Sequence, residues 1–226
     1  MSAVWVWIGY LGVEPFARKR MPHLLVSSTR LLTGRWRDAQ VGRDILYGIT
    51  LAVALRLFNG LTNLYMIPHV NGETPEMPWA TRLGLASTAA QCLTSFTNAV
   101  LTMLVLLGLF VLYRSVLRKP WLAVGALFLT LAVLNLQNEN AWFDLSINAA
   151  VCVVLVAFIV RCGLVAGVVF FWGQALVGSM PWTHDLSNWT AEYYVVPGLV
   201  LVALLVWGFT SAIGDQKIFG SFSLEE

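Results

Sequence analysis

The chain has 226 residues, of which 58% are apolar and only 12% are charged. Ordinary soluble domains carry about 25% charged residues, so this composition excludes a soluble globular fold and favours an integral membrane protein built of α-helices. The formal net charge of +2 gives no reason to expect a nucleic-acid partner.

The chain begins with an apolar and aromatic segment, residues 1–12, that contains Trp5, Trp7 and Tyr10. A spanning helix needs about 20 mostly apolar residues, so this segment is too short to cross a bilayer alone. We interpret it as a partial transmembrane helix, the inner end of a helix whose beginning is missing. A short helix lying in the membrane interface is the alternative.

Residues 13–43 form a basic segment that we assign to the cytoplasm. Its leucines recur near helical spacing with arginines close by, a pattern typical of an amphipathic helix on a surface of anionic lipid. Charged side chains that simply extend to the membrane edge are the alternative. The candidate lipid-facing residues are Arg18, Lys19, Arg20, Arg35, Arg37 and Arg43.

Residues 44–213 are predicted to be a six-helix membrane domain, followed by a cytoplasmic tail at residues 214–226. A single helix over 145–177 would exceed what a bilayer accommodates, so we place a tight hairpin at Arg161 to Gly163. The predicted spans are Ile45–Ile67, Gly84–Tyr113, Trp121–Leu136, Leu145–Val160, Gly163–Val177 and Tyr193–Ile213.

The basic residues predict the orientation of these spans. Cytoplasmic loops of membrane proteins carry an excess of Lys and Arg. If residues 13–43 are cytoplasmic, alternation places twelve of the fourteen basic residues on that side. Only Arg82 then lies outside, and Arg56 lies within a helix. We therefore expect a multi-pass protein with its basic loops and its C-terminus in the cytoplasm.

Several short motifs bracket the chain: Glu14-Pro15, Arg18 to Pro22, Gly34 to Asp38, Val41 to Asp44, Asp185 to Trp189, Gly214, Phe219-Gly220 and Leu224. With these motifs the chain resembles the C-terminal membrane module that follows the kinase domain in acidobacterial-type serine/threonine protein kinases. The resemblance implies a location in the bacterial inner membrane. It also implies a cytoplasmic kinase domain as partner, either in the same polypeptide or on another chain.

Kinase activity itself is not expected of these residues. Phosphoryl transfer needs a glycine-rich phosphate loop, a strand lysine, a His-Arg-Asp-type base and an Asp-Phe-Gly-type metal ligand, and the sequence contains none of them. We therefore expect a non-catalytic anchor or sensor module, without a cofactor. Cys92, Cys152 and Cys162 lack the spacing of a zinc site or a disulfide framework.

Polar residues within two consecutive spans mark a candidate intramembrane site. Their spacing places each set on one helix face, and the two faces together favour a small polar cavity with Arg56 as a fixed positive charge. Hydrogen bonding across the bundle is the alternative. This site supports a second functional hypothesis, a small-solute transporter or membrane-complex subunit. Its residues are Arg56, Asn59, Asn63, Gln91, Ser95 and Asn98.

Two further features concern ligands and partners. Four residues of the outer loops form a candidate outer-face ligand site, although their spacing matches no metal motif; solvated loop charges are the alternative. Gly163-x-x-x-Gly167 has the spacing of a helix dimerisation motif, which leaves a homodimer open. The outer-face residues are Glu139, Asp144, His184 and Asp185.

Overall fold

The computed structural model describes residues 26–66, 85–117, 119–135, 141–178 and 192–213. The partial helix predicted at residues 1–12, the tail at residues 214–226 and the first part of the basic segment lie outside the described residues.

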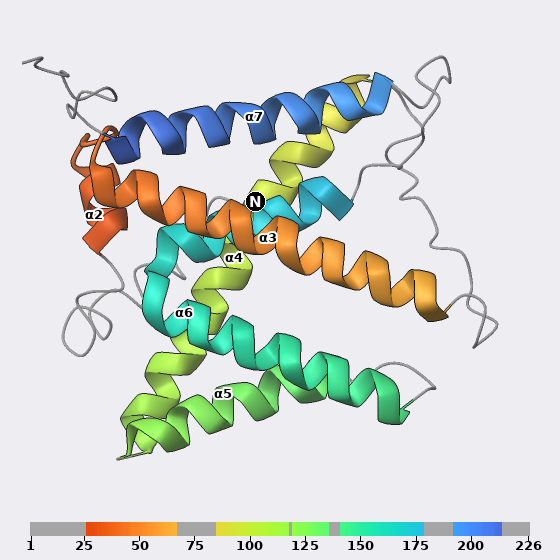
Figure 1. Cartoon of the computed structure of the whole chain (residues 1–226). Helices are drawn as coiled ribbons and strands as arrows, with labels where there is room; N and C mark the ends of the chain where they lie inside the picture. Colours follow the sequence, from red (N-terminus) through yellow and green to blue (C-terminus); the bar gives the residue numbers. More distant parts are fainter. Residues whose placement is uncertain (1–25, 67–84, 118, 136–140, 179–191, 214–226) are drawn as a thin grey trace, which may run out of the picture.

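The described residues form six α-helices and no strand (Figure 1), which confirms the predicted all-α bundle. The helix bounds lie close to the predicted spans. The largest difference is at the first span, which begins at Ala39 rather than at Ile45. The helices are α2 (Val26–Leu32), α3 (Ala39–Met66), α4 (Leu85–Val116), α5 (Pro120–Asn135), α6 (Ala141–Gly178) and α7 (Glu192–Ile213).

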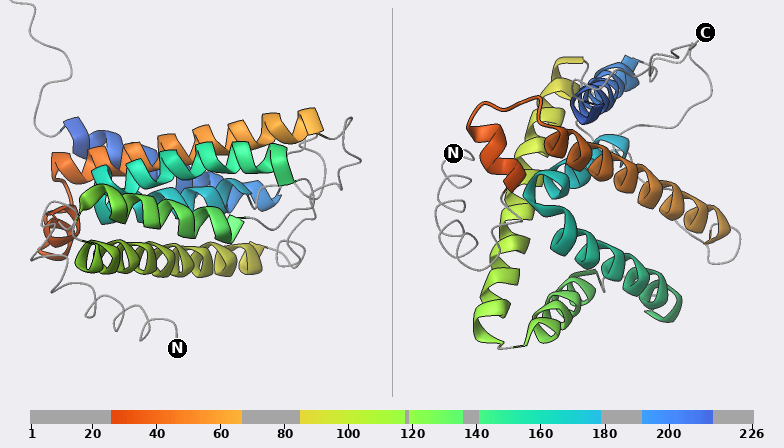
Figure 2. Two further views of the ribbon diagram at one scale, coloured as in Figure 1. Left: turned by 90° about the horizontal axis from the view of Figure 1, so that it is seen from below. Right: turned by 60° about the vertical axis from the view of Figure 1, so that its left-hand side comes forward.

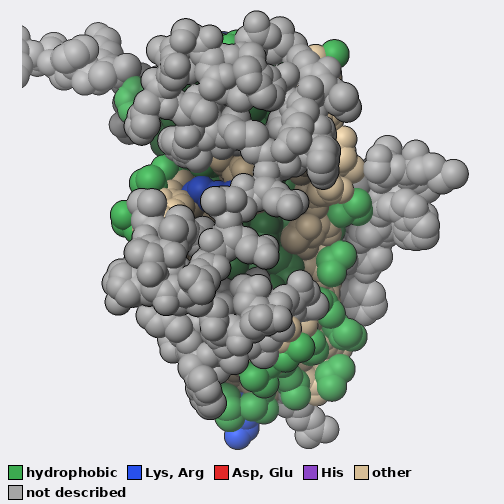
Figure 3. Space-filling model, turned by 90° about the vertical axis from the view of Figure 1, so that its right-hand side faces the viewer, with side chains coloured by type: hydrophobic (Ala, Val, Ile, Leu, Met, Phe, Trp, Pro, Cys, Tyr) green, Lys and Arg blue, Asp and Glu red, His purple; other side chains and the backbone are tan. Residues whose placement is uncertain are grey.

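Four of these helices, α3, α4, α6 and α7, contain stretches long and apolar enough to cross a membrane. Helix α5 is apolar but shorter, with 16 residues. Large hydrophobic side chains on the outer faces stay exposed, such as Leu199, whose exposed fraction is 64%. Hydrophobic side chains also gather in the lower part of the face seen in Figure 3. Such surfaces suit lipid rather than water, so the chain is a membrane protein.

Helix α6 is broken at Gly163, where φ is 85° and ψ is −171°. A continuous helix of 38 residues would be about 57 Å long, nearly twice the hydrocarbon thickness of about 30 Å. Glycine tolerates this conformation because it has no Cβ. Residues 141–162, the first arm, therefore run opposite to residues 164–178, the second arm (Figures 1 and 2). This turn is where the sequence predicts a hairpin.

Helices α4, α5 and the first arm form the side-chain-packed half of the bundle. Large apolar residues interlock here, and the Tyr113 hydroxyl lies 2.7 Å from Thr130 Oγ1 across the α4–α5 contact. Thr130 already donates its hydroxyl proton to the carbonyl of Ala126, so Tyr113 is the donor of this bond. The buried residues of this core include Leu106, Leu107, Phe110, Leu127, Val156 and Ile159.

Helix α3, the second arm and α7 form the glycine-packed half, in which backbones approach one another closely. A Cβ at Gly42 would lie 2.4 Å from the Ala212 nitrogen of α7, and one at Gly48 would lie 2.7 Å from the Ala166 oxygen of the second arm. No side chain fits at either position. Glycine is required at both because it alone lets the neighbouring backbone come this near.

Seven of the eight described Lys and Arg residues lie at one end of the bundle, which we name the cationic end. There α3 and α5 begin, α4 and α7 end, and α6 turns; α2 lies across it (left side of Figure 1 and of the left view in Figure 2). The eighth is Arg56, within α3. The seven residues are Arg30, Arg35, Arg37, Arg43, Arg114, Lys119 and Arg161.

Candidate functional site

The loop between α2 and α3 begins with a well-defined helix end. The Arg35 amide donates to the Arg30 carbonyl at 2.9 Å, and the Gly34 amide donates to the Leu31 carbonyl at 3.0 Å. This pair of bonds is the Schellman motif, which needs a left-handed residue just beyond the helix. Gly34 supplies it with φ of 83°. The loop therefore leaves α2 in a fixed direction.

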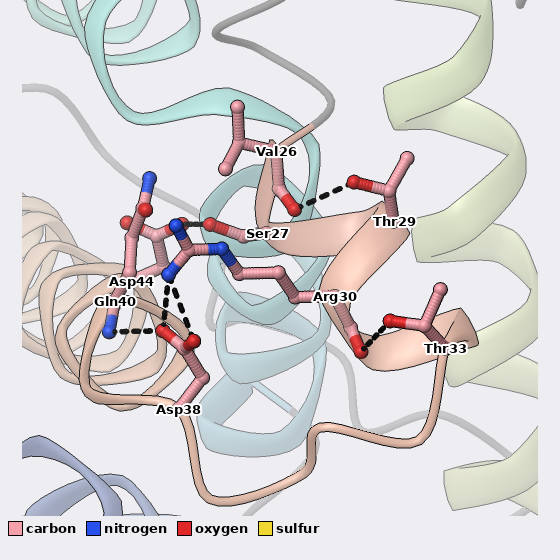
Figure 4. Close-up of polar contacts among 8 residues, drawn as sticks. All are labelled: Val26, Ser27, Thr29, Arg30, Thr33, Asp38, Gln40 and Asp44. Atoms are coloured by element: carbon pink, nitrogen blue, oxygen red, sulfur yellow. Dashed lines mark hydrogen bonds and ion pairs between the residues drawn. The ribbon is translucent and has the colours of Figure 1, made fainter.

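Asp38 anchors the other end of the loop (Figure 4). One carboxylate oxygen of Asp38 accepts the Gln40 amide at 2.9 Å, so Asp38 is the N-cap of α3. The Arg30 guanidinium donates to both oxygens, at 2.7 and 2.8 Å. These contacts, with the Gln40 amide first, hold the pKa of the Asp38 carboxyl below its ordinary value. Helix α3 starts at Ala39 because this cap stands directly before it.

A second polar contact joins α2 to α3 inside the bundle. The Ser27 hydroxyl donates to a carboxylate oxygen of Asp44, and both side chains are buried. A buried carboxylate requires a hydrogen-bonding partner, and Ser27 provides one from the neighbouring helix (Figure 4). Helix α2, despite its seven residues, is therefore fixed to α3 by Ser27–Asp44 and by Arg30–Asp38.

The loop presents an exposed basic and aromatic surface at the cationic end. Arg35 and Arg37 are exposed, and the exposed fraction of Trp36 between them is 61%. Residues 34–38 line an open hollow of about 520 Å³. Arg43, one turn into α3, is also exposed. The other candidate lipid-facing residues, Arg18, Lys19 and Arg20, lie outside the described residues.

Arg56, the basic residue predicted within the membrane, is half-buried between α3 and the end of the second arm. A Cβ at Gly178 would lie 2.4 Å from its Nη2 atom and 2.9 Å from Cζ, so the guanidinium rests on the backbone of the last residue of α6. The C-terminal end of a helix carries partial negative charge on its unpaired carbonyls. That end provides a favourable position for the Arg56 charge.

The second arm connects to its two neighbours through single polar side chains. Gln174 Nε2 donates to the Ala52 carbonyl of α3 at 2.8 Å. Trp172 Nε1 donates to the Cys92 carbonyl of α4 at 3.1 Å. Residues two apart point to opposite sides of a helix, about 200° around its axis. These two donors therefore attach the second arm to α3 on one side and to α4 on the other.

The structure does not bring the two predicted polar faces together, because the second arm lies between α3 and α4. Asn59 is half-buried beside Arg56, whereas Asn98 on α4 is exposed. The hydroxyl of Ser95 donates to the carbonyl of its own helix at Gln91, at 2.7 Å. The side chain of Asn63 lies outside the described residues.

Gln174 and Trp172 are the polar residues that sequence reasoning missed. The prediction was based on several polar residues that share one helix face. Gln174 and Trp172, by contrast, each stand alone on their face of an apolar segment. A solitary glutamine in a hydrophobic span is itself a signal, because an amide in lipid requires a hydrogen-bonding partner.

The predicted outer-face site cannot be placed: Glu139, His184 and Asp185 lie outside the described residues, as does the side chain of Asp144, which belongs to α6. Within the part of the chain that the structure describes, no group of three His, Cys, Asp or Glu residues is arranged to hold a metal ion. Gly167, half of the predicted dimerisation spacing, packs inside the chain, because a Cβ there would lie 2.3 Å from Met103 Sδ of α4.

Comparisons of the chain with protein-family models, with curated proteins and with solved structures found no match.

Proposed function

We propose that this chain is a non-catalytic membrane module that anchors, and by helix rearrangement regulates, a cytoplasmic serine/threonine-kinase-like domain in a bacterial inner membrane. The observation that carries the proposal is the cationic end, which gathers seven of the eight described basic residues. An excess of Lys and Arg favours the cytoplasmic side. The sequence motifs that resemble the kinase-associated module supply the identity of the partner.

The loop between α2 and α3 offers a physical route for regulation. It is attached to α2 by the Arg30–Asp38 contact and to α3 by the Asp38 cap. A change in the position of either helix therefore moves Arg35 and Arg37 at the membrane surface. A ligand that prefers one helix arrangement shifts the population of arrangements, and this loop would transmit the shift to a bound domain.

Orientation is tested by cysteine labelling. In a variant without native cysteines, a single cysteine replaces Thr33 in the loop, and intact cells and inverted membrane vesicles are treated with a membrane-impermeant maleimide. We expect position 33 to react only in inverted vesicles. Reaction of position 33 in intact cells would contradict the cytoplasmic assignment.

Kinase association is tested with the tagged full chain purified from its source organism in mild detergent. We expect phosphate transfer from labelled ATP to co-purify with the chain, and to fall when Arg35 and Arg37 are both changed to Gln. Lys119→Gln, which removes a cation of α5 at the same end, is the control. Absence of kinase activity from the purified sample would contradict the proposal.

A second candidate function, solute binding or transport, has one specific observation in its favour. Arg56 is half-buried within a candidate span, and its guanidinium lies against the backbone at the C-terminal end of α6. In proteoliposomes, saturable uptake of a small anion that is lost in Arg56→Gln and retained in Arg43→Gln would support this function. Equal uptake by both variants would exclude Arg56 as the binding residue.

A further inference from the structure

A groove of about 400 Å³ lies between α5 and the first arm of α6. The two helices pack side by side in the lower part of Figure 1 and in both views of Figure 2. Apolar side chains form most of its walls, and one basic residue stands at its end. The residues used below are Trp121, Gly125, Phe128, Val153, Val156 and Arg161.

The groove has a direction with respect to the membrane. Helix α5 starts at the cationic end and the first arm finishes there, so Trp121 and Arg161 share that end. Phe128 and Val153 lie deeper along the same two helices. From Arg161 to Val153 the first arm rises by about 12 Å. The groove therefore extends from the membrane surface into the hydrocarbon.

The mouth of the groove is cationic and the interior is apolar. Arg161 is exposed, and Lys119 Nζ lies 5.9 Å from the centroid of the Trp121 ring. Two positive charges thus stand beside an interfacial tryptophan, an arrangement typical of the headgroup level of a membrane. Below them, the floor is formed by residues such as Val156, whose exposed fraction is 3%.

The groove is open at its centre because of Gly125. A Cβ at Gly125 would meet no atom within 4 Å, so the glycine does not serve to bring helices together. Val153 on the opposite wall keeps an exposed fraction of 58%. An apolar channel that opens sideways, within the membrane, is filled by the acyl chain of a lipid.

We propose that this groove binds one anionic phospholipid, with its phosphate between Arg161 and Lys119 and one acyl chain along Gly125. Acyl chains of every lipid suit the walls, so the preference for an anionic headgroup comes from the two cations. Each basic residue near anionic lipid favours binding about fivefold. The proposal requires that the chain lies in a membrane and does not depend on a kinase partner.

The test is native mass spectrometry of the full chain, released from detergent micelles that contain equal amounts of phosphatidylglycerol and phosphatidylcholine with identical acyl chains. We expect the wild-type chain to retain one phosphatidylglycerol molecule in preference to phosphatidylcholine. Arg161→Gln should lower that preference about fivefold, and Arg161→Lys should restore most of it. Equal retention of the two lipids by the wild-type chain would overturn the proposal.

Filling the groove provides the second arm of the test. Gly125→Leu places a side chain in the groove, its Cβ meeting no atom within 4 Å, and should abolish retention of both lipids. Gly198→Leu is the matched control, because a Cβ at Gly198 of α7 also meets no atom within 4 Å. Unchanged lipid retention in Gly125→Leu, or an equal loss in Gly198→Leu, would place the lipid elsewhere and overturn the proposal. Replacement of the lipid mass by a second copy of the chain would also overturn it.

Discussion

The two halves of the bundle hold their helices together in different ways. In the glycine-packed half, backbones come within contact of one another at Gly42 and Gly48. In the side-chain-packed half, large residues such as Phe110 and Leu127 fill the space between helices, and a Cβ at Gly125 would meet no atom within 4 Å. Lipid is as apolar as a leucine side chain, so association in a membrane depends on close packing and hydrogen bonds. The two halves show that small and large residues both achieve it.

The largest effect is expected from Gly48→Leu, which breaks the glycine-packed half. Its Cβ would lie 2.7 Å from a backbone oxygen and 3.0 Å from the Cβ of Val169, so the helices must separate. We expect the free energy of unfolding in mixed micelles to fall by about 3 kcal/mol, measured by circular dichroism during denaturing-detergent titration.

Gly60→Leu is the control for that substitution, because it lies on the same helix and its Cβ meets no atom within 4 Å. We expect it to leave stability unchanged or to raise it by about 1 kcal/mol through helix propensity. Equal losses in the two variants would mean that close backbone approach does not stabilise this half.

In the side-chain-packed half the opposite substitution should be harmful. Leu127 is fully buried in the core of α4, α5 and the first arm. Leu127→Ala leaves a cavity, and we expect the free energy of unfolding to fall by about 2 kcal/mol in the same titration. Leu129→Ala, at a position of α5 with an exposed fraction of 63%, should change it little. Similar effects at the two positions would contradict side-chain packing as the source of stability.

A smaller effect is expected where the second arm joins the halves. Gln174→Leu removes the hydrogen bond to Ala52 and should lower the free energy of unfolding by about 1 kcal/mol, the range found for hydrogen bonds between membrane helices. Asn98→Leu, which removes an amide from an exposed face of α4, is the control and should not destabilise the chain. A loss in Asn98→Leu as large as in Gln174→Leu would contradict the role of the interhelical bond.

The smallest effect concerns the loop at the cationic end. The pKa of Asp38 lies below its ordinary value in the folded chain, so its stabilising contribution is present at pH values above about 4 and is lost as the pH falls through the folded pKa. Asp38→Asn keeps an N-cap residue but loses the charge. We expect wild type to exceed Asp38→Asn in thermal midpoint at pH 7, with the difference shrinking as the pH falls below about 4. A difference independent of pH would exclude the carboxylate charge as its cause.

Hydropathy predicted the helices well because the cost of placing polar backbone and charge in lipid constrains a span's length and ends. The limit that a bilayer sets on helix length predicted a break in α6, and Arg161 to Gly163 gave its place. Hydropathy did not predict the start of α3, because Val41 and its neighbours lie in a polar stretch of sequence. The Asp38 cap and the Ser27–Asp44 contact, which hold that first turn, depend on α2 being folded against α3.

The arrangement of the polar residues was harder to predict. Helical spacing shows that Arg56 and Asn59 share a face, but it does not show which helix covers that face. The structure places the end of the second arm against Arg56, by means of Gly178. Consecutive helices in the sequence, α3 and α4, are thereby separated in space by a segment that follows both of them, and α5 as well, in the chain.

The break at Gly163 also determines the direction in which the last helix runs. With two arms in α6, successive helical segments from α3 to α7 run in alternating directions, and α7 finishes at the end of the bundle where α3 begins. With a straight α6, α7 would start from the other end of the bundle and would finish opposite the start of α3. A single glycine in the middle of the chain thus determines the end of the bundle at which α7 finishes.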